Sequence, residues 1–560
     1  MYKKVFSRRL RGNNHLIHLW SDEGYEKIEW TNQAYIECDD SKSTHKGLNG
    51  ESLYKTPNWT PDNNKVHFHD MPIHQKFLVD KYGINDEPSK THREVFFDIE
   101  IEMGEALTEE YIKSAPKKVT SIAWYDKQVD LWGIVILDPK GQLKHTKARN
   151  KEIIPCKTED ELLLKFIEKF REIDPDIIVG WNSDYFDIPY LYYRMCNVLG
   201  EDVARYLSPI GYVRETPWYK DQFIQIAGVE SLDYMRLHKK FSWADEPSFK
   251  LDAIGEKYVG MNKIEYEGSL DKLFEDDIHK FIQYNFVDVE ILKKLDEKLD
   301  YLALVKNLAH KGKHNYSEVY ANTKTQDGAI SAYLLSKGIV PPAKERNPFT
   351  KENYAGGYLF CPKAGIYNYV FDEDLTSLYP SIIMTINIGK ETMIGRIIDA
   401  DDRNNRLGLN DLKRKDPEEE LIIENVKRKR TKIKIGELIN LIQDMKMSIS
   451  ANGVMFDTNR ESVLSTILKK WFDERVMYKN KMKTAYKSGD KELGDAFHMK
   501  QYTMKILLNS LYGATSLASF RYGSVILSEA TTLSGQRIIQ ESALTANRHL
   551  NKVMRGEQEI

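Results

Sequence analysis

Asp98 and Glu100 stand two residues apart in the apolar segment VFFDIEIE, at residues 95–102. If this segment is a strand, both carboxylates point to one face, while Phe97, Ile99 and Ile101 point to the other. Paired carboxylates on an apolar strand repel each other and resist desolvation, so they need a cation. A solvated edge strand with alternating charge explains the same pattern, so the pair alone decides no function.

Two more acidic segments follow along the chain. NSDYFD places Asn182, Phe186 and Asp187 directly after the apolar run IIVGW, and YNFVD places Tyr284 and Asp288 four residues apart, on one helix face. Singly, either carboxylate could be an ordinary surface group. Phosphodiester hydrolysis uses two divalent ions about 3.5–4 Å apart, and hard ions such as Mg²⁺ or Mn²⁺ take oxygen ligands. Carboxylates that converge from distant segments are therefore the residues that this chemistry requires.

The intervening sequence predicts the elements that must position these groups. Four apolar segments are typical of strands, at residues 95–102, 120–126, 131–138 and 176–181. They alternate with a helical pattern at 161–173, which indicates an α/β domain with a mixed sheet. Residues 278–305 predict one long amphipathic helix. Two helical stretches between residues 461 and 509, joined by a polar turn at 487–492, predict an αα-hairpin.

The composition sets only broad limits. The 560 residues indicate about three to five domains, and 41% hydrophobic with 29% charged residues is ordinary for a soluble globular protein. The net charge of −3 neither requires nor excludes a nucleic-acid partner, because binding depends on a local basic track. The four cysteines match no disulfide or zinc spacing, which indicates a reducing, cytosolic setting. No apolar stretch approaches the ~20 residues that a membrane span needs, and no secretory signal is expected.

A strongly charged segment lies at residues 400–435 and contains the run KRKR. We interpret it as a solvated surface insertion, in preference to a nuclear address or a nucleic-acid patch.

The ordered patterns DxE, NxxxFD and YxxxD, spread over about 190 residues, resemble the three exonuclease motifs of proofreading DNA polymerases of family B. In that family the nuclease domain has an RNase H-like fold. The resemblance implies that Asp98, Glu100, Asp187 and Asp288 hold the metal ions and that Tyr284 orients the attacking water.

The segment DLTSLYPSII, at residues 374–383, resembles motif A of the same family. A turn opens a helix here, and backbone N–H groups at a helix start suit a triphosphate. The resemblance implies a polymerase site with Asp374 as the catalytic carboxylate, Asp374 and Leu375 as metal ligands, and Ser377, Leu378 and Tyr379 around the nucleotide.

Three further segments extend this second site. KILLNSLYGA, from residue 505, fits motif B, FDERVMYKN resembles a triphosphate clamp, and YAGG fits a loop near DNA. A basic pair four residues apart is by itself usually solvated surface, and the YAGG motif is weak alone. The resemblance implies that the nucleotide-binding residues include Arg475, Lys479, Lys505 and Asn509, and that the DNA-binding residues are Tyr354, Gly356, Gly357, Tyr512 and Gly513.

The resemblance covers about residues 90–550 and, within the family, points to replicative polymerases of the T-even phage type. It implies an α/β multi-domain fold, with an RNase H-like 3′–5′ exonuclease domain, a partial polymerase palm and helical-hairpin fingers. Residues 212–229 fall where that group carries a β-hairpin that separates primer from template. The predicted divisions are an amino-terminal domain at 1–95 with a contribution from about 303–345, an exonuclease domain at 96–302, palm at 346–455, fingers at 456–513 and palm again at 514–560.

A family B palm uses a second metal-binding aspartate, in a turn soon after motif B, and residues 514–560 contain no aspartate. Because one carboxylate does not normally hold two ions, we predict that this polypeptide alone does not polymerise DNA. A naturally split gene, a truncated fragment and a stand-alone exonuclease with a vestigial palm are the competing explanations, and intact motifs A and B favour the first. A non-catalytic DNA-binding fragment is disfavoured, because binding needs no set of four carboxylates.

The resemblance also implies cofactors and partners. We expect two Mg²⁺ or Mn²⁺ ions at each active site, primer-template DNA and dNTPs as ligands, and a carboxy-terminal polymerase fragment as the partner chain. A sliding clamp and a single-strand-binding protein are expected partners of the complete assembly. No membrane association is expected, and the location implied is the cytoplasm of a bacterial host of a phage.

Overall fold

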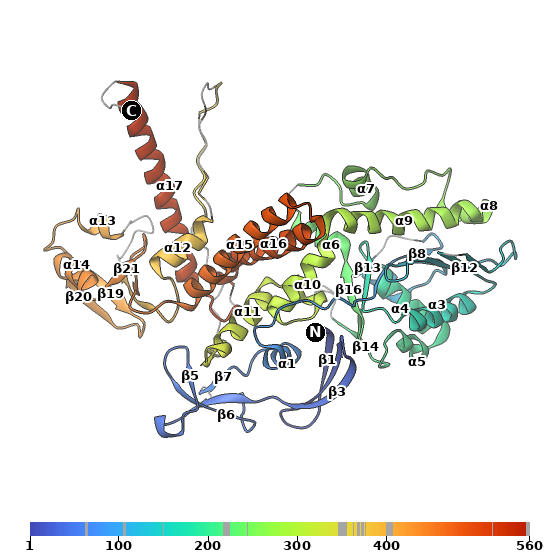
Figure 1. Ribbon diagram of the computed structural model, residues 1–560, viewed down its shortest axis with the longest axis horizontal. Helices are drawn as coiled ribbons and strands as arrows, with labels where there is room; N and C mark the ends of the chain where they lie inside the picture. The colour runs from blue at the N-terminus through green and yellow to red at the C-terminus, as the bar shows by residue number, and fades with distance from the viewer. Residues whose placement is uncertain are drawn as a thin grey trace. The chain divides into compact units, whose positions relative to one another are not determined.

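The computed structural model describes residues 1–61, 65–104, 108–148, 150–216, 224–242, 245–344, 356–361, 363–366, 370, 374–375, 377–398, 407–517 and 519–555. The chain divides into two compact units (Figure 1). The first comprises residues 1–32 and 72–321, and the second comprises residues 33–71 and 322–560. The five-part division drawn from the sequence stays a prediction.

A seven-stranded mixed sheet forms the centre of the first unit, in the order β11-β12-β10-β9-β8-β13-β16. Its strands are β8 (Glu94–Ile101), β9 (Val119–Asp126), β10 (Leu131–Leu137), β11 (Thr146–Ala148), β12 (Lys151–Cys156), β13 (Ile177–Gly180) and β16 (Glu230–Asp233). β8 runs antiparallel to β9 and parallel to β13. The four predicted strands and the mixed sheet are therefore confirmed.

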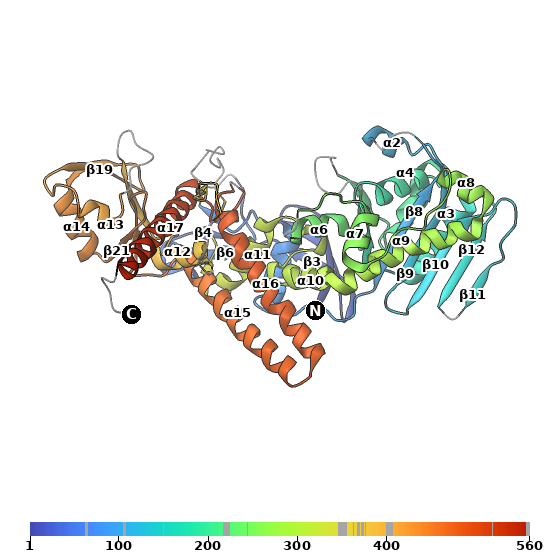
Figure 2. The ribbon, with the colours of Figure 1, turned by 90° about the horizontal axis from the view of Figure 1, so that it is seen from above.

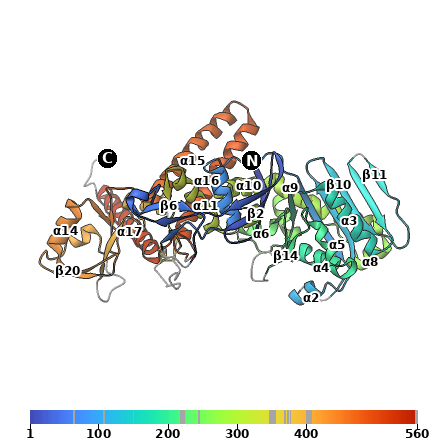
Figure 3. The same ribbon diagram turned by 90° about the horizontal axis from the view of Figure 1, so that it is seen from below.

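Helices cover both faces of this sheet. α3 (Glu159–Ile173) and α4 (Asp187–Leu199) lie over one face, and α9 (Ile278–Leu299) crosses the other (Figures 2 and 3). Val95, Phe97 and Ile99 of β8 are buried in the apolar core on the α3–α4 side. Because side chains alternate along a strand, Asp98 and Glu100 lie on the opposite face, toward α9.

The helix predicted at residues 278–305 is two helices, so that prediction was wrong in its length. α9 ends at Leu299, the next residue, Asp300, has left-handed backbone geometry (φ 54°), and α10 (Tyr301–Gly312) follows. The buried Asp296 carboxylate accepts a hydrogen bond from the backbone N–H of Leu302 (3.2 Å) and thereby caps the new helix. Apolar periodicity continues through the break, because both helices bury one face, so the pattern alone could not reveal it.

The remaining elements of the first unit are short. β1 (Tyr2–Arg9), β2 (Asn14–Ser21) and β3 (Gly24–Thr31) form an antiparallel sheet, against which α1 (Ile73–Tyr82) packs. β14 (Val213–Glu215) and β15 (Ile224–Ile226) are an antiparallel pair within the segment where a hairpin was expected, although its tip lies outside the described residues. The other elements are α2 (Glu109–Ser114), α5 (Glu201–Ala204), η2 (Arg205–Leu207), α6 (Tyr234–Phe241), α7 (Leu251–Val259), α8 (Leu270–Asp276) and η3 (Tyr316–Glu318).

The second unit contains two separate five-stranded sheets. The first, in the order β17-β5-β6-β4-β7, is built from β4 (Ala34–Glu37), β5 (His45–Gly47), β6 (Ser52–Thr56), β7 (Val66–His67) and β17 (Ile339–Val340), with η1 (Asp40–Lys42) beside it. The second, in the order β20-β19-β18-β22-β21, is built from β18 (Met393–Ile398), β19 (Glu420–Asn425), β20 (Arg430–Lys434), β21 (Met447–Ile449) and β22 (Val454–Asp457).

The charged segment at 400–435 contributes to this second sheet. Leu421 of β19 is buried with Leu438 of α14 (Ile435–Asp444) and Leu412 of α13 (Leu409–Leu412). The described part of the segment, residues 407–435, is therefore solvated on one face only, because its other face packs on an apolar core.

Five further helices are described in the second unit. They are α11 (Asn322–Ser336), α12 (Leu378–Ile386), the antiparallel pair α15 (Val463–Lys487) and α16 (Lys491–Thr515), and α17 (Val525–Met554). The pair confirms the predicted αα-hairpin. Among the residues that the structure describes, no helix is long and apolar enough to span a bilayer.

Candidate functional site

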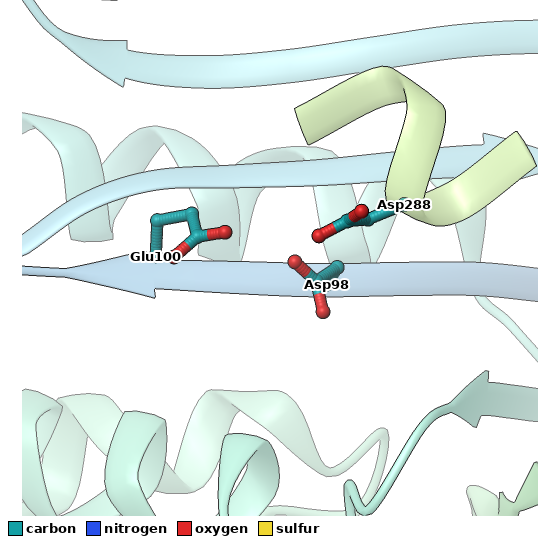
Figure 4. Close-up of side chains that lie close together, drawn as sticks. All are labelled: Asp98, Glu100 and Asp288. Carbon is teal, nitrogen blue, oxygen red and sulfur yellow. The ribbon is translucent and has the colours of Figure 1, made fainter. Parts of the chain in front are cut away.

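Asp98, Glu100 and Asp288 form an acidic cluster in the first unit. Their nearest carboxylate oxygens all lie within 4.8 Å of one another. Asp98 and Glu100 extend from β8, and Asp288 reaches toward them from α9 (Figure 4). Asp288 is buried, and the other two are half-buried. Within the described residues this is the one group of three or more His, Cys, Asp or Glu side chains that is able to hold a metal ion.

The sheet and α9 are fixed together close to this cluster. Glu100 pairs across the strands with Ser121 of β9, so both side chains lie on the α9 face. The Ser121 hydroxyl donates a hydrogen bond to Oδ1 of the buried Asn285 on α9 (2.6 Å). Asn285 stands three residues before Asp288, so this bond sets the position of the helix turn that carries the carboxylate.

The fourth predicted carboxylate, Asp187, lies beside the cluster but is not counted within it. β13 pairs with β8 only as far as Phe96, so the edge of β8 beyond that residue has no strand partner on this side. The buried Asp187 carboxylate, at the start of α4, accepts a hydrogen bond there from the backbone N–H of Ile99 (3.3 Å). It is thereby held one residue from Asp98.

Burial and mutual repulsion change the acidity of these groups. Desolvation, followed by the charges of Asp187 and Glu100, raises the pKa of Asp98 well above its ordinary value. Desolvation and the charge of Asp288 raise the pKa of Glu100 to about 8, and burial raises that of Asp187 to about 7. Carboxylates in such an environment are ionised together only when a cation is close. The atoms available as metal ligands are all carboxylate oxygens, so they fit a hard divalent metal ion.

Lys263 is a site residue that the sequence reasoning missed. Its Nζ lies 2.5 Å from Oδ2 of Asp288 and 3.2 Å from the hydroxyl of Tyr284, and it stands 5.2 Å from the centre of the Tyr284 ring. The carboxylates outweigh the desolvation of the ammonium group and raise the pKa of Lys263. Lys263 lies in the loop before α8, at no regular spacing from Tyr284 or Asp288, so the sequence held no signal for it.

A buried ion-pair network holds the NSDYFD turn. Asn182 has left-handed backbone geometry (φ 64°), and its N–H donates to Oδ1 of Asp233 (3.0 Å). Asp184 accepts hydrogen bonds from Ser231 (2.7 Å) and from Arg236 (2.7 Å). These contacts connect the turn to β16 and α6, and therefore fix the loop that leads into Asp187. Phe186, the last residue of the turn, packs against the core beneath α4.

The second unit brings motif A and motif B together through aromatic side chains. The ring of Tyr379, on α12, lies 4.4 Å from that of Tyr512, on α16, measured between centroids. A Cβ added to Gly357 would stand 3.3 Å from the Tyr379 hydroxyl, and Gln536 of α17 donates a hydrogen bond to the carbonyl of Gly356 (2.6 Å). We call this group (Gly356, Gly357, Tyr379, Tyr512 and Gln536) the tyrosine platform. Three sequence motifs that are far apart thus meet at one place.

The residues around the platform are more open. Asp374 and Gly513 are exposed, while Leu375, Ser377 and Leu378 are half-buried. Ser377 has left-handed backbone geometry (φ 53°) at the start of α12. Asp374 belongs to no group of three potential metal ligands among the described residues. Tyr354 and residues 371–373, which directly precede Asp374, lie outside those residues.

The fingers-like hairpin carries the remaining predicted positions. Arg475 on α15 is half-buried, and its buried Nε has no hydrogen-bond partner among the described residues. Lys479, one turn further along, is exposed. On α16, Lys505 stands 5.9 Å from the centre of the Tyr502 ring, and Asn509 is exposed one turn later. The described contacts do not bring these four side chains into one cluster.

Comparison with known proteins agrees with this arrangement. Residues 95–254 match the family described as DNA polymerase family B, exonuclease domain, and residues 321–559 match DNA polymerase family B. A DNA-directed DNA polymerase of Escherichia phage RB69 is 28% identical over 461 residues, which cover 72% of this chain and 47% of the relative. The enzyme of Enterobacteria phage T4 is 28% identical over 452 residues, covering 71% and 47%. A DNA polymerase of Pyrococcus glycovorans is 24% identical over 487 residues, covering 84% and 53%.

Both matched families describe parts of the same protein class, and together they cover well over half of the sequence. The chain therefore belongs to DNA polymerase family B, with an RNase H-like exonuclease domain, a partial palm and helical-hairpin fingers. It spans about half the length of the curated relatives that it matches.

Proposed function

We propose that this chain is the amino-terminal portion, or one subunit, of a phage-type replicative DNA polymerase that removes misincorporated nucleotides with a 3′–5′ exonuclease. The observation that carries the exonuclease is the convergence of Asp98, Glu100 and Asp288 within 4.8 Å, with pKa values that favour a bound cation. Membership of the family and its exonuclease match support the substrate class, DNA.

Each residue of the exonuclease site has a proposed task. Asp98, Glu100, Asp187 and Asp288 are the ligands for two Mg²⁺ or Mn²⁺ ions, which when bound would activate water and stabilise the leaving oxygen. Tyr284 orients the water through its hydroxyl. Lys263 holds that hydroxyl and the Asp288 carboxylate in place and balances negative charge at the cluster.

The tyrosine platform is the proposed nucleotide site of the polymerase. Asp374 and Leu375 are its metal ligands, and the start of α12 faces the triphosphate with Ser377, Leu378 and Tyr379. The unpaired Nε of Arg475 suits a phosphate oxygen. The other nucleotide contacts are Lys479, Lys505 and Asn509, and the DNA contacts are Tyr354, Gly356, Gly357, Tyr512 and Gly513.

Nucleotidyl transfer requires a second carboxylate beside Asp374. No aspartate occurs in residues 514–560, so we propose that a carboxy-terminal polymerase segment, supplied as a second chain, provides it. Primer-template DNA and dNTPs are the proposed ligands. A sliding clamp and a single-strand-binding protein would act on the complete assembly, in the cytoplasm of a bacterial host.

The decisive experiment follows degradation of a 5′-labelled single-stranded DNA by the purified chain in Mg²⁺. Products should shorten from the 3′ end, and Asp98→Ala with Glu100→Ala should abolish the reaction. Asp374→Ala serves as a matched control, because it removes an exposed carboxylate from the other unit and should leave degradation intact. Normal degradation by the double variant would show that the nuclease assignment is wrong.

Primer extension tests the second half of the proposal. The chain alone should extend no primer, and addition of a carboxy-terminal fragment that carries the missing aspartate should restore synthesis. Robust extension by the chain alone would contradict the need for a further segment. Degradation that proceeds normally, together with no extension under any condition, would favour a stand-alone exonuclease.

A further inference from the structure

The run KRKR, at residues 427–430, forms the tip of the hairpin between β19 and β20 (Figures 1 and 3). The Arg428 N–H donates to the Asn425 carbonyl (2.9 Å), and the Asn425 N–H donates to the Lys429 carbonyl (3.0 Å). Val426, Lys427 and Arg428 are therefore the three loop residues, all of them exposed. The Val426 N–H still donates to the Ile394 carbonyl of β18 (3.3 Å), whereas Lys427 and Arg428 lie beyond the strand ladder.

The stem of this hairpin is electrically balanced. Every cation on β20 faces a glutamate of the β19 side. Lys434 pairs with Glu418 (2.7 Å), Lys432 pairs with Glu420 (3.1 Å), and Arg430 pairs with Glu424 (3.1 Å). We call these three pairs the rungs. β20 is an edge strand, and charged side chains on an edge protect it from pairing with another chain. Edge protection and solubility thus account for the rungs.

The tip is different, because its positive charge is uncompensated. Lys427, Arg428 and Lys429 make no ion pair with any residue that the structure describes. Lys427 and Arg428 lie outside the ladder, so edge protection does not require them. Three adjacent cations without counter-charges repel one another, and a polyanion relieves this repulsion.

Arg428 also occupies a backbone position that disfavours it. Its φ is +61°, at the third position of a three-residue hairpin loop, where glycine or asparagine is usual. Any larger L-residue is strained in this left-handed conformation. An arginine there lowers the stability of the turn and adds a cation at its most projecting point. Folding alone gives no reason for that choice.

We propose that Lys427, Arg428 and Lys429 form a contact site for the phosphate backbone of duplex DNA. A two-stranded ribbon with a basic tip has a shape and charge that suit a DNA groove edge, where phosphates lie on both sides. The contact is electrostatic and independent of base sequence. The inference rests on the proposed function only in taking DNA as the partner. An acidic protein surface is the competing occupant.

The test measures binding of the full chain to a fluorescein-labelled DNA duplex, by fluorescence anisotropy in EDTA, over a series of salt concentrations. The tip variant Lys427→Gln/Lys429→Gln is compared with the rung variant Lys432→Gln/Lys434→Gln. Both variants remove two positive charges from the same hairpin, at positions two residues apart. The change in net charge and the spacing of the substitutions are therefore matched. Only the tip variant removes charges that have no internal partner.

We expect the tip variant to bind duplex DNA about tenfold more weakly at low salt, and its slope of log K against log salt to be shallower by about 1.8. The rung variant should keep the parental slope. Arg428→Gly should weaken DNA binding as well, while its melting temperature stays equal to or above that of the parent, because glycine suits the conformation. A purely structural arginine would give the opposite pattern.

Three outcomes overturn the proposal. These are an unchanged affinity and slope in the tip variant, equal losses in the tip and rung variants, and a tip variant that binds DNA normally but no longer binds poly-glutamate. Degradation of single-stranded DNA in Mg²⁺, measured on the same preparations, reports the proposed function independently. A chain that does not degrade DNA would refute that function, whereas the role of the hairpin tip would still be decided by the binding data.

Discussion

The acidic cluster and the tyrosine platform differ in how much of their chemistry the described residues supply. In the cluster, three carboxylates and Lys263 converge from β8, α9 and a loop, and Asp187 is held beside them. In the platform, aromatic and glycine contacts bring the motifs together, while Asp374 is exposed and belongs to no group of three potential metal ligands among the described residues. Paired, desolvated carboxylates require a cation if they are to be ionised together. A single exposed carboxylate, by contrast, needs further ligands before it can hold a metal ion.

The largest expected effect is on the cluster itself. Asp288→Asn should reduce exonuclease turnover by roughly a thousandfold or more, because it removes a metal ligand and the charge that Lys263 balances. Gel analysis of single-stranded DNA degradation in Mg²⁺ measures this change. Asp374→Asn is the matched control in the other unit. An equal loss of exonuclease turnover in both variants would show that the acidic cluster is not a separate exonuclease site.

A smaller loss, about a hundredfold, is expected for Lys263→Ala. Groups that hold metal ligands in place usually contribute tenfold to a hundredfold. Single-turnover degradation should slow with little change in DNA affinity, and Lys263→Arg should recover part of the rate. Lys272→Ala, which removes another lysine of the same region, should behave as the parent does. Full activity in Lys263→Ala would limit that residue to a structural role.

The proposed nucleotide site is addressed by Arg475→Ala. Loss of a hydrogen bond to a charged group costs about 1.5–3 kcal/mol, so binding of a dNTP in Mg²⁺ should weaken roughly tenfold or more. Isothermal titration calorimetry of the complete assembly with primer-template DNA measures the affinity. Degradation of single-stranded DNA should not change, which keeps the two sites separable. Unaltered dNTP affinity would show that Arg475 does not contact the nucleotide.

The smallest effect concerns stability in EDTA. The pKa of Glu100 is about 8 in the folded chain, against an ordinary value of 4.5. Between these values the unfolded chain has already lost the proton that the folded chain retains, so stability falls as pH rises from about 4.5 to about 8. Glu100→Gln should remove this loss and raise the stability by on the order of a few kcal/mol near the upper end of that range.

Thermal melting at several pH values detects this difference. At a pH below 4.5, parent and Glu100→Gln should melt alike, because the parental carboxyl is then protonated in both states. Asp374→Asn keeps Glu100, so its stability should fall with pH as that of the parent does. A Glu100→Gln variant that melts at a lower temperature than the parent at every pH would contradict the raised pKa of Glu100 in the folded chain.

Sequence patterns predicted helices and strands well where the apolar residues recurred with a single period, of strand or of helix. Alternation identified β8, and the helix–turn–helix of α15 and α16 followed from apolar spacing around a polar turn. The same reasoning missed the break at Asp300, because two successive helices that bury one face keep the period unchanged. It also described residues 400–435 only as solvated, because the apolar positions of β19 are few among many charges.

The sequence by itself determined which carboxylates could act together, since DxE, NxxxFD and YxxxD specify residue types and their local faces. Only the tertiary structure decided that Asp288 meets Asp98 and Glu100, that Asp187 is bound to the edge of β8, and that Lys263 completes the group. It likewise decided that Tyr379 meets Tyr512. Local spacing is set by the periods of helix and strand, whereas distances between segments depend on how their apolar faces pack.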